Sequence, residues 1–238
     1  MNTNFGYLQA RLQARYATLP DENQWLHLAG LKEFASFLEE LRNSPMSGWI
    51  TGLSGSSSPE DIEKHLRSYL LDTMHEIAGW FNSPWSFTFN SLETLLELPT
   101  IDYLVRYGSA AAESIDDPEI LELLHTGKQS DDLLNAWIVS WMSQWPQMSD
   151  RHYQAIESLI ELLKQHRVQF TERSVKSAWE YRQELENKLR FFFRRNGLQP
   201  VAAFAYLVLV VLVLERLRAE LLQRALFSEA VAVPNGDV

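Results

Sequence analysis

VAAFAYLVLVVLVL, residues 201–214, runs directly into ERLRAELLQR, residues 215–224, and this stretch decides the fold. No charged or strongly polar side chain interrupts residues 201–214, so every face of a helix built from them is apolar and must be covered. A membrane-spanning helix needs roughly 20 apolar residues, and shorter runs are typical of buried core helices. We therefore expect a buried helix at 201–214 that does not span a membrane and whose charged continuation reaches the surface.

The competing interpretation of this stretch is a buried strand, because four of its residues are β-branched valines that favour pleated structure. The alanines at its start and the residues that follow Leu214 favour a helix on summed propensity. Nearly every other long segment repeats its apolar residues with a period near 3.6, and paired strand patterns are absent. The sequence therefore predicts an all-α fold around a buried apolar helix at 201–214.

The remaining helices are predicted from apolar periodicity and from helix-ending residues. Their approximate ranges are 5–19, 22–42, 59–81, 91–98, 100–107, 117–125, 130–145, 150–170 and 171–196. The aromatic segment 85–89 is expected to be a connection, Gly197 to be the C-terminal cap of the preceding helix, and residues 229–238 to fray. Trp137, Trp141 and Trp145 follow at intervals of four, which favours packing against a neighbouring helix over an aromatic binding face.

Composition limits the possible functions. The chain has 238 residues, 46% hydrophobic content and no cysteine, so it can bury a large core but has no disulfides, thiolate metal sites or cysteine nucleophile. We expect a cytoplasmic protein, because the N-terminus has no signal-peptide pattern. The net charge of −10 divides into 8 basic and 21 acidic residues in 1–150 (−13) and 13 and 10 in 151–238 (+3). Such an acidic chain argues against nucleic acid as the main partner.

One basic segment offers an alternative. Lys188, Arg190, Arg194 and Arg195 surround the three phenylalanines 191–193. Contact with RNA or with anionic lipid is one interpretation, and a solvated face or a protein interface is the favoured one for so small a cluster.

No catalytic, cofactor or metal site is predicted. Residues 126–130, TGKQS, lack the earlier glycine and the residue order of a phosphate-binding loop, and Gly127 is better interpreted as a helix cap. The six histidines form no HExxH motif, and adjacent His75 and Glu76 point in different directions on a helix. Neither converging carboxylates nor a nucleophile elbow can be identified, so we expect no catalysis by this chain alone.

Both ends of the chain resemble a known family. YLQARLQARYATL, QWLHLAGLKEFASFLEELRNSPMSGWI and SSPEDIEKHLRSYLLDTMHEI resemble the start of the C-type subunits of V-type and archaeal-type rotary ATPases, which are known as d-type subunits in vacuolar enzymes. ENKLRFFFRRNGLQPVAAFAYLVLVVLVLERLRAELLQR resembles the closing helices of that family. The positions that match there are Gly197, Pro200, Tyr206-Leu207, Glu215 and Leu217-Arg218. The ends make up about half of the chain, and the middle matches only as helices.

The resemblance implies a compact helical funnel or bundle of related helical units, in a short and divergent member of the family. Family members usually have three such units, and this chain has room for about two, at about 1–89 and 90–228, within a single domain. The implied role is non-catalytic coupling of the central stalk to the membrane proteolipid ring, on the cytoplasmic face of the membrane, for proton or sodium transport. The resemblance makes Tyr7, Arg11, Arg15, Glu215 and Arg218 the candidates for the partner interface. The alternative is a helical adaptor or regulatory module unrelated to ion transport.

Overall fold

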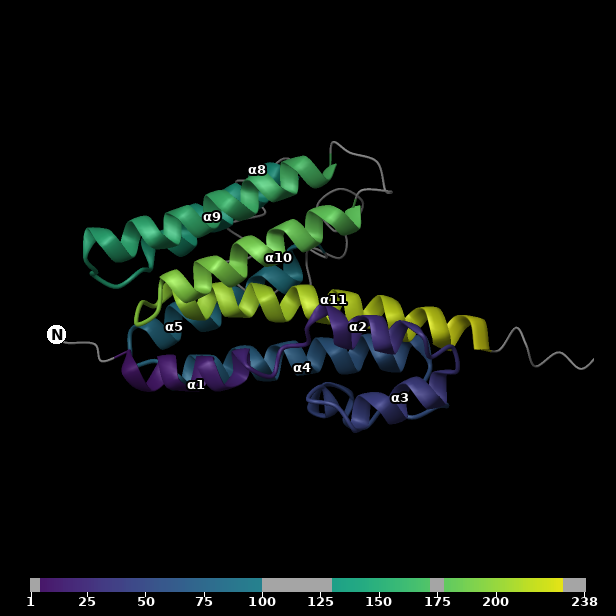
Figure 1. Cartoon of the computed structure of the whole chain (residues 1–238). Coiled ribbons are helices and arrows are strands. Elements are labelled where there is room, and N and C mark those ends of the chain that lie inside the picture. The colour runs from purple at the N-terminus through teal and green to yellow at the C-terminus, as the bar shows by residue number, and fades with distance from the viewer. Residues whose placement is uncertain (1–4, 100–129, 172–177, 229–238) are drawn as a thin grey trace, which may run out of the picture. The chain divides into compact units, whose positions relative to one another are not determined.

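The computed structural model of the chain describes residues 5–99, 130–171 and 178–228, and Figure 1 shows their helices. All regular secondary structure within these ranges is helical, which confirms the predicted all-α fold. The longer helices are α1 (Gly6–Tyr16), α2 (Glu22–Ala29), α3 (Phe34–Arg42), α4 (Pro59–Trp80), α5 (Trp85–Asn90), α8 (Ser130–Ser143), α9 (Asp150–Thr171), α10 (Ala178–Arg195) and α11 (Val201–Ser228). Two 3-10 turns, η1 (Ser47–Ile50) and η2 (Ser91–Glu93), follow α3 and α5.

The predicted apolar helix is the buried centre of the structure. Residues 201–207 of α11 are all buried, as are Leu209, Val210, Val213 and Leu214. α10 packs along α11, and α1, α3 and α9 also contact it (Figure 1). The buried stripe continues past residue 214 through Leu217 and Leu221, so the charged half of α11 still has one face in the core.

The structure divides into two compact units. One unit combines residues 1–73 with residues 149–238, and the other comprises residues 74–148. The first unit joins the two ends of the chain because the C-terminal α11 packs against the N-terminal α1 and α3. This division is not sequential and differs from the expected pair of units on either side of residue 89.

The single helix predicted at 22–42 is wrong, because the chain forms two helices there. α2 begins with a capping box in which Asp21 and Gln24 each accept a hydrogen bond from the other's backbone N–H, both at 2.9 Å. α2 ends at Gly30, a residue with low helix propensity. The carbonyl oxygen of Leu31 then accepts a hydrogen bond of 2.7 Å from Nε of Arg224. This hydrogen bond, from a residue far away in the sequence, stabilises the break between α2 and α3.

The aromatic segment expected to be a connection is instead α5. Trp85, Thr88 and Phe89 are buried at spacings of i, i+3 and i+4 while Phe87 is exposed, which is a helical pattern and not an alternating one. The Thr88 carbonyl oxygen accepts a hydrogen bond of 2.8 Å from the indole N–H of Trp141 on α8. Trp137 and Trp141 are themselves buried and stacked, with ring centroids 5.5 Å apart, as expected of a packing face.

The turn between α10 and α11 differs from the expectation in one residue. Leu198, and not Gly197, has the left-handed conformation, with φ of 63°. The backbone N–H of Leu198 donates a hydrogen bond of 3.2 Å to Oε1 of Gln9 on α1, and this bond holds the turn. The helices expected at 100–107 and 117–125, Gly127 and the tail at 229–238 lie outside the described residues.

Candidate functional site

The three candidate residues on α1 share its exposed face. Tyr7, Arg11 and Arg15 follow at intervals of four and are all exposed, while Leu8 and Leu12, the next residues after Tyr7 and Arg11, are buried. Nε of Arg11 donates a hydrogen bond of 3.1 Å to the Tyr7 hydroxyl oxygen. The Arg11 guanidinium also lies 5.3 Å from the centre of the Tyr7 ring. The aromatic ring and the cation therefore form one ordered surface feature.

The two candidate residues on α11 form ion pairs with other helices. Glu215 pairs with Arg182 of α10 at 3.3 Å. Nε of Arg218 donates to both carboxylate oxygens of Glu63 on α4, at 2.6 and 2.8 Å. These hydrogen bonds are the main cause of the raised pKa of Arg218. Both pairs are largely exposed, so they orient the helices and add little to stability.

The five candidates form two groups along α11. α1 contacts the turn before α11, where Gln9 accepts the bond from Leu198. Glu215 lies 14 residues after Val201, which corresponds to about 21 Å along a helix axis. Tyr7 and Arg11, each two residues from Gln9, therefore lie on a surface separate from the Glu215 and Arg218 ion pairs.

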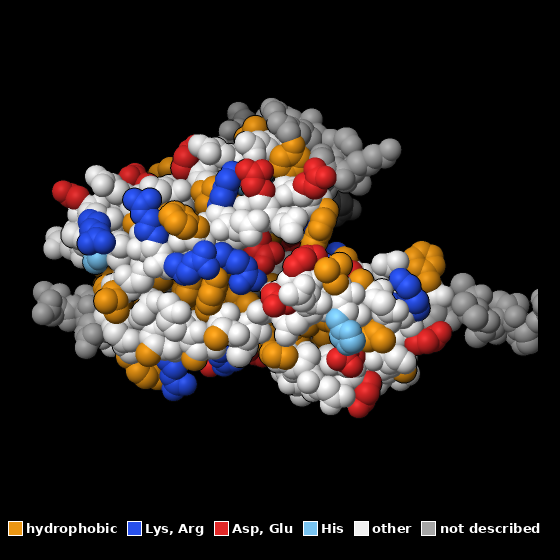
Figure 2. Space-filling model, viewed as in Figure 1, with side chains coloured by type: hydrophobic (Ala, Val, Ile, Leu, Met, Phe, Trp, Pro, Cys, Tyr) orange, Lys and Arg blue, Asp and Glu red, His pale blue; other side chains and the backbone are white. Residues whose placement is uncertain are grey.

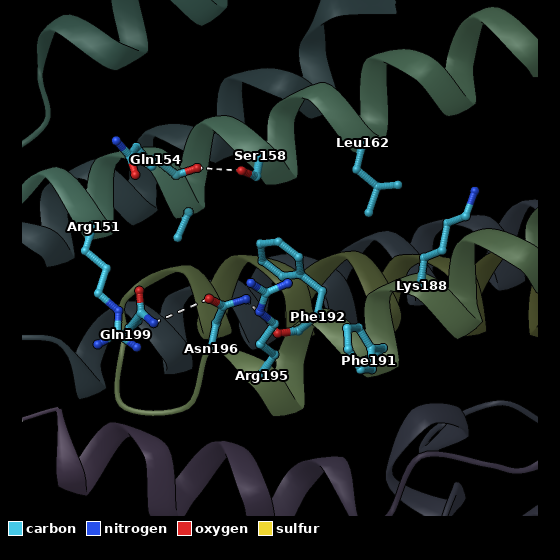
Figure 3. Close-up of a pocket in the computed structure, with 11 residues that line it drawn as sticks. Arg151, Gln154, Ser158, Leu162, Lys188, Phe191, Phe192, Arg195, Asn196 and Gln199 are labelled. Atoms are coloured by element: carbon cyan, nitrogen blue, oxygen red, sulfur yellow. Dashed lines mark hydrogen bonds between the residues drawn. The ribbon is translucent and has the colours of Figure 1, made fainter.

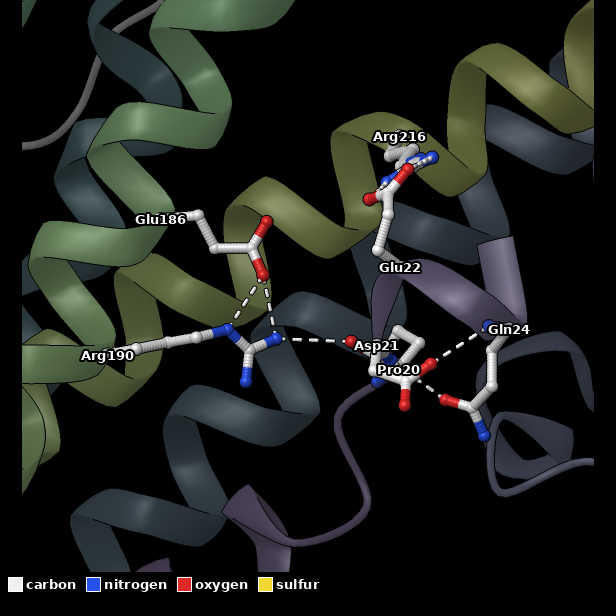
Figure 4. Close-up of polar contacts among 7 residues, drawn as sticks. All are labelled: Pro20, Asp21, Glu22, Gln24, Glu186, Arg190 and Arg216. Carbon is white, nitrogen blue, oxygen red and sulfur yellow. Dashed lines mark hydrogen bonds and ion pairs between the residues drawn. The ribbon is translucent and has the colours of Figure 1, made fainter. Parts of the chain in front are cut away.

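Three arginines, none of them among the predicted interface residues, fasten α10 and α11 to the N-terminal helices. Nη2 of Arg190 on α10 donates to the carbonyl oxygen of Pro20 at 3.1 Å and to Glu186 at 2.7 Å (Figure 4). The Arg190 guanidinium also lies over the Tyr16 ring, 5.6 Å from its centre. Arg190 therefore fixes the segment between α1 and α2.

Arg216 and Arg224 of α11 also form hydrogen bonds with residues of the N-terminal part of the chain. Arg216 lies between the rings of Trp25 and Trp179, 4.6 and 4.2 Å from their centres, and donates two hydrogen bonds to Glu22. These bonds are the main reason that the pKa of Glu22 is lowered. Arg224 is 7% exposed and bonds the carbonyl oxygen of Leu31. The partners of both arginines on the N-terminal helices lie nearly 200 residues away, so no local sequence signal identifies this role.

A groove of about 600 Å³ lies between α9 and α10, and Figure 3 shows its lining. One end holds Arg151 of α9 with Arg195 of α10, and Lys188 lies near the other end. Figure 2 shows Lys and Arg side chains gathered over α9 and α10, with exposed hydrophobic side chains between them. The remaining lining residues are Gln154, Ala155, Ser158, Leu162, Phe191, Phe192, Asn196 and Gln199. The groove thus combines positive charge with an apolar wall and has no acidic lining residue.

The described part of the chain contains no group of three or more His, Cys, Asp or Glu side chains with the arrangement of a metal site. Within those same residues, no helix has both the length and the apolar character needed to cross a bilayer. α11 illustrates the reason, because Glu215, Arg216 and Arg218 interrupt it soon after its apolar half.

Comparison with known proteins found no family model, no curated protein and no solved structure that matches this chain.

Proposed function

We propose that this chain is a non-catalytic rotor-coupling component of a V/A-type rotary ATPase, which links the central stalk to the membrane proteolipid ring. One observation carries the proposal. The C-terminal stretch and the N-terminal stretches up to residue 73 that resemble the C-type subunits of this family fold together in one compact unit. Their contacts include Gln9 with Leu198, Glu22 with Arg216 and Glu63 with Arg218. Two resemblances far apart in the sequence therefore belong to one continuous body.

The internal bonding of this unit suits a part that transmits torque. Such a part must not deform when one partner pushes against the other, so its helices need fixed relative positions. Here the fully apolar half of α11 is surrounded by other helices. Arg190, Arg216 and Arg224 add hydrogen bonds from α10 and α11 to the segment between α1 and α3. Such a body supports a mechanical role in proton or sodium transport at the cytoplasmic face of the membrane.

The contacts of the five interface candidates suggest different tasks for them within this role. Glu215 and Arg218 already bind Arg182 and Glu63, so we assign them to orienting α11 relative to α10 and α4. Tyr7 and Arg11 bind each other on an exposed face. An aromatic ring beside an arginine is a combination that protein interfaces favour. We therefore assign the α1 face to contact with the stalk or the ring.

Isolation of the tagged chain from detergent-solubilised membranes of its source tests the proposal. We expect the ring proteolipid and stalk proteins to co-purify in fixed ratio and to be identified by mass spectrometry. A complex that contains neither would overturn the rotor role. Association with other soluble proteins in the absence of all rotary ATPase components would instead support a helical adaptor.

Substitution of the α1 face tests its assignment. Tyr7→Ala combined with Arg11→Glu should leave the melting temperature within about 2 °C, because both residues are exposed. ATP-driven ion pumping should fall while ATP hydrolysis persists, because the stalk and the ring lose their connection. Lys64→Glu is the matched control, since Lys64 is an exposed cation on a different helix, α4. Equal pumping in both variants would contradict the assignment of the α1 face.

A further inference from the structure

We propose that the groove between α9 and α10 binds an organic anion with an apolar portion. Arg151 and Arg195 would hold the anionic group, and Phe191, Phe192 and Leu162 would contact the apolar portion. The proposal does not rest on the rotor-coupling role. It rests on the charges, the apolar wall and the buried polar residues of the groove itself.

The two arginines are available for a ligand. Neither Arg151 nor Arg195 makes a hydrogen bond or ion pair with another described residue, whereas Arg190, Arg216 and Arg224 are each bonded to carbonyl or carboxylate oxygens. Figure 3 shows Arg151 reaching down from α9 towards Gln199, and Arg195 beside Asn196 on α10. Guanidinium groups bind carboxylates and phosphates through paired hydrogen bonds. This end of the groove therefore fits an anionic group.

Lys188 contributes less to the positive charge of the groove than the two arginines do. Its Nζ lies 2.6 Å from a carboxylate oxygen of Glu184, one turn earlier on α10. That ion pair neutralises Lys188 locally. The anionic group is therefore expected at the arginine end of the groove.

The rest of the groove suits an apolar group. Phe191 is 61% exposed although it lies near the buried Phe193, and it forms part of the groove wall with Phe192, Leu162 and Ala155. Ligand pockets usually have volumes of about 300–1,000 Å³ and are mostly apolar with a few polar groups. The groove has a volume of about 600 Å³, within this range, but it is more polar than such pockets, because four of its eleven lining residues are apolar.

The lining also contains a buried polar atom that lacks a bond. Gln199 is 6% exposed, and its Oε1 has no hydrogen-bond partner among the described residues. The amide cannot simply turn over, because its Nε2 donates to Oδ1 of Asn196 at 3.4 Å, while Nδ2 of Asn196 donates to the Phe192 carbonyl oxygen. Buried acceptors are nearly always bonded in folded proteins, so an unpaired one has room for a partner such as a water molecule or a polar group of a ligand. Gln199 therefore supports a polar occupant at the same end as the arginines.

Calorimetric titration of the full chain with dodecyl phosphate, below its micelle concentration, tests this site. We expect saturable binding of one molecule per chain. Inorganic phosphate has the same charged group without the apolar portion, and it should bind at least about tenfold more weakly. Equal affinity for the two probes would overturn the proposal. So would the absence of both saturable binding of dodecyl phosphate in solution and binding to anionic lipid in a bilayer.

Substitutions of lining residues test whether dodecyl phosphate binds in the groove. Arg151→Gln with Arg195→Gln should weaken dodecyl phosphate binding at least about tenfold, because two charge-assisted bonds are lost. Phe191→Ser should weaken it with no loss of inorganic phosphate binding. Arg194→Gln is the matched control, since Arg194 is an exposed neighbour on α10 that does not line the groove. Circular dichroism melting checks that each variant is folded, and an equal loss in Arg194→Gln would refute the site.

The anion could be a free metabolite or a lipid in a bilayer, and vesicle sedimentation distinguishes these sources. Vesicles of phosphatidylglycerol are compared with vesicles of phosphatidylcholine. Binding to free dodecyl phosphate alone supports a soluble ligand. Binding to phosphatidylglycerol vesicles that disappears in the Arg151→Gln, Arg195→Gln variant supports a lipid. Vesicle binding that is unchanged in this variant, without binding of the free probe, would place the contact elsewhere and refute the groove.

Discussion

Arg216 on α11 holds the carboxylate of Glu22 in the first turn of α2 through two hydrogen bonds, of 2.9 and 3.1 Å. The two residues are 194 positions apart in the sequence. The guanidinium also lies between the rings of Trp25 and Trp179, so one side chain connects α2, α10 and α11. The contacts of the Arg216 guanidinium, as well as the apolar core, therefore join α2, α10 and α11.

This ion pair predicts a dependence of stability on pH. The hydrogen bonds from Arg216 lower the pKa of Glu22 below its ordinary value, which is about 4.3 in an unfolded chain. A group with a lowered folded pKa stabilises the fold above its unfolded pKa, and this stabilisation is lost as the pH falls towards the folded pKa. Stability should therefore decrease as the pH falls below about 4.3. Urea unfolding at about pH 7 and about pH 3 should show a smaller decrease for Glu22→Gln than for the parent chain. An identical decrease would show that Glu22 does not contribute.

Arg224 should be essential to stability. Its side chain is buried and donates to the carbonyl oxygens of Leu31 and Leu28 and to Glu220. Arg224→Met keeps an apolar stem but leaves these acceptors without their partner, so we expect a loss of about 3–5 kcal/mol in unfolding free energy. Arg218→Met on the same helix is the control, because it breaks only an exposed ion pair and should cost at most about 1 kcal/mol. Urea denaturation measures both, and equal losses would contradict the role of Arg224.

Two neighbouring valines test the depth of α11 in the core. Val210 is 1% exposed, whereas Val211 is only partly buried. Val210→Asp places an unpaired carboxylate in the core and should cost at least about 4 kcal/mol, enough to unfold many domains. Val211→Asp should cost less, because its carboxylate reaches water. Thermal melting followed by circular dichroism distinguishes the two, and a larger effect at Val211 would contradict this register of the helix.

The hydrogen bond of Trp141 should stabilise the unit at residues 74–148. Its indole N–H donates to the buried carbonyl oxygen of Thr88 at 2.8 Å, so Trp141→Phe leaves that oxygen without this bond. We expect a loss of about 0.5–1.5 kcal/mol beyond the effect of the smaller ring, because the oxygen keeps its hydrogen bond from the Ser91 hydroxyl. Trp137→Phe provides the comparison, because Trp137 is equally buried and its indole makes no hydrogen bond with another described residue. Hydrogen exchange of the α5 amides should accelerate in Trp141→Phe only; equal acceleration in both would exclude this bond as the cause.

Some of the fold follows directly from local sequence. The unbroken apolar run at 201–214 requires a buried helix, and the four-residue spacing of Leu8 and Leu12 places one face of α1 inward. Ser58 and Asp61 are typical of a helix start, and the structure has the reciprocal hydrogen bonds there. The basic residues around Phe191–Phe193 indicate the groove only in part, because no local pattern connects them with Arg151.

Other features could not be predicted from neighbouring residues. Gly30 ends α2 locally, but the break between α2 and α3 is also stabilised by the distant Arg224, and the Leu198 turn is held by a hydrogen bond to Gln9. The aromatic segment that alternates like a strand forms α5, where Thr88 accepts the bond from Trp141. In each case the deciding partner lies far away in the sequence, so a tertiary contact overrides local propensity.

The sequence by itself determined that this chain is helical and that most of residues 201–214 must be buried, because periodicity and unbroken hydrophobicity are local properties. Only the tertiary structure decided that residues 1–73 and 149–238 form one unit. It also decided that Arg216 and Arg224 reach acceptors on the N-terminal helices while Arg151 and Arg195 face an open groove. The physical reason is that a guanidinium is charged wherever it lies, and its role depends on which acceptors the fold brings within hydrogen-bonding distance.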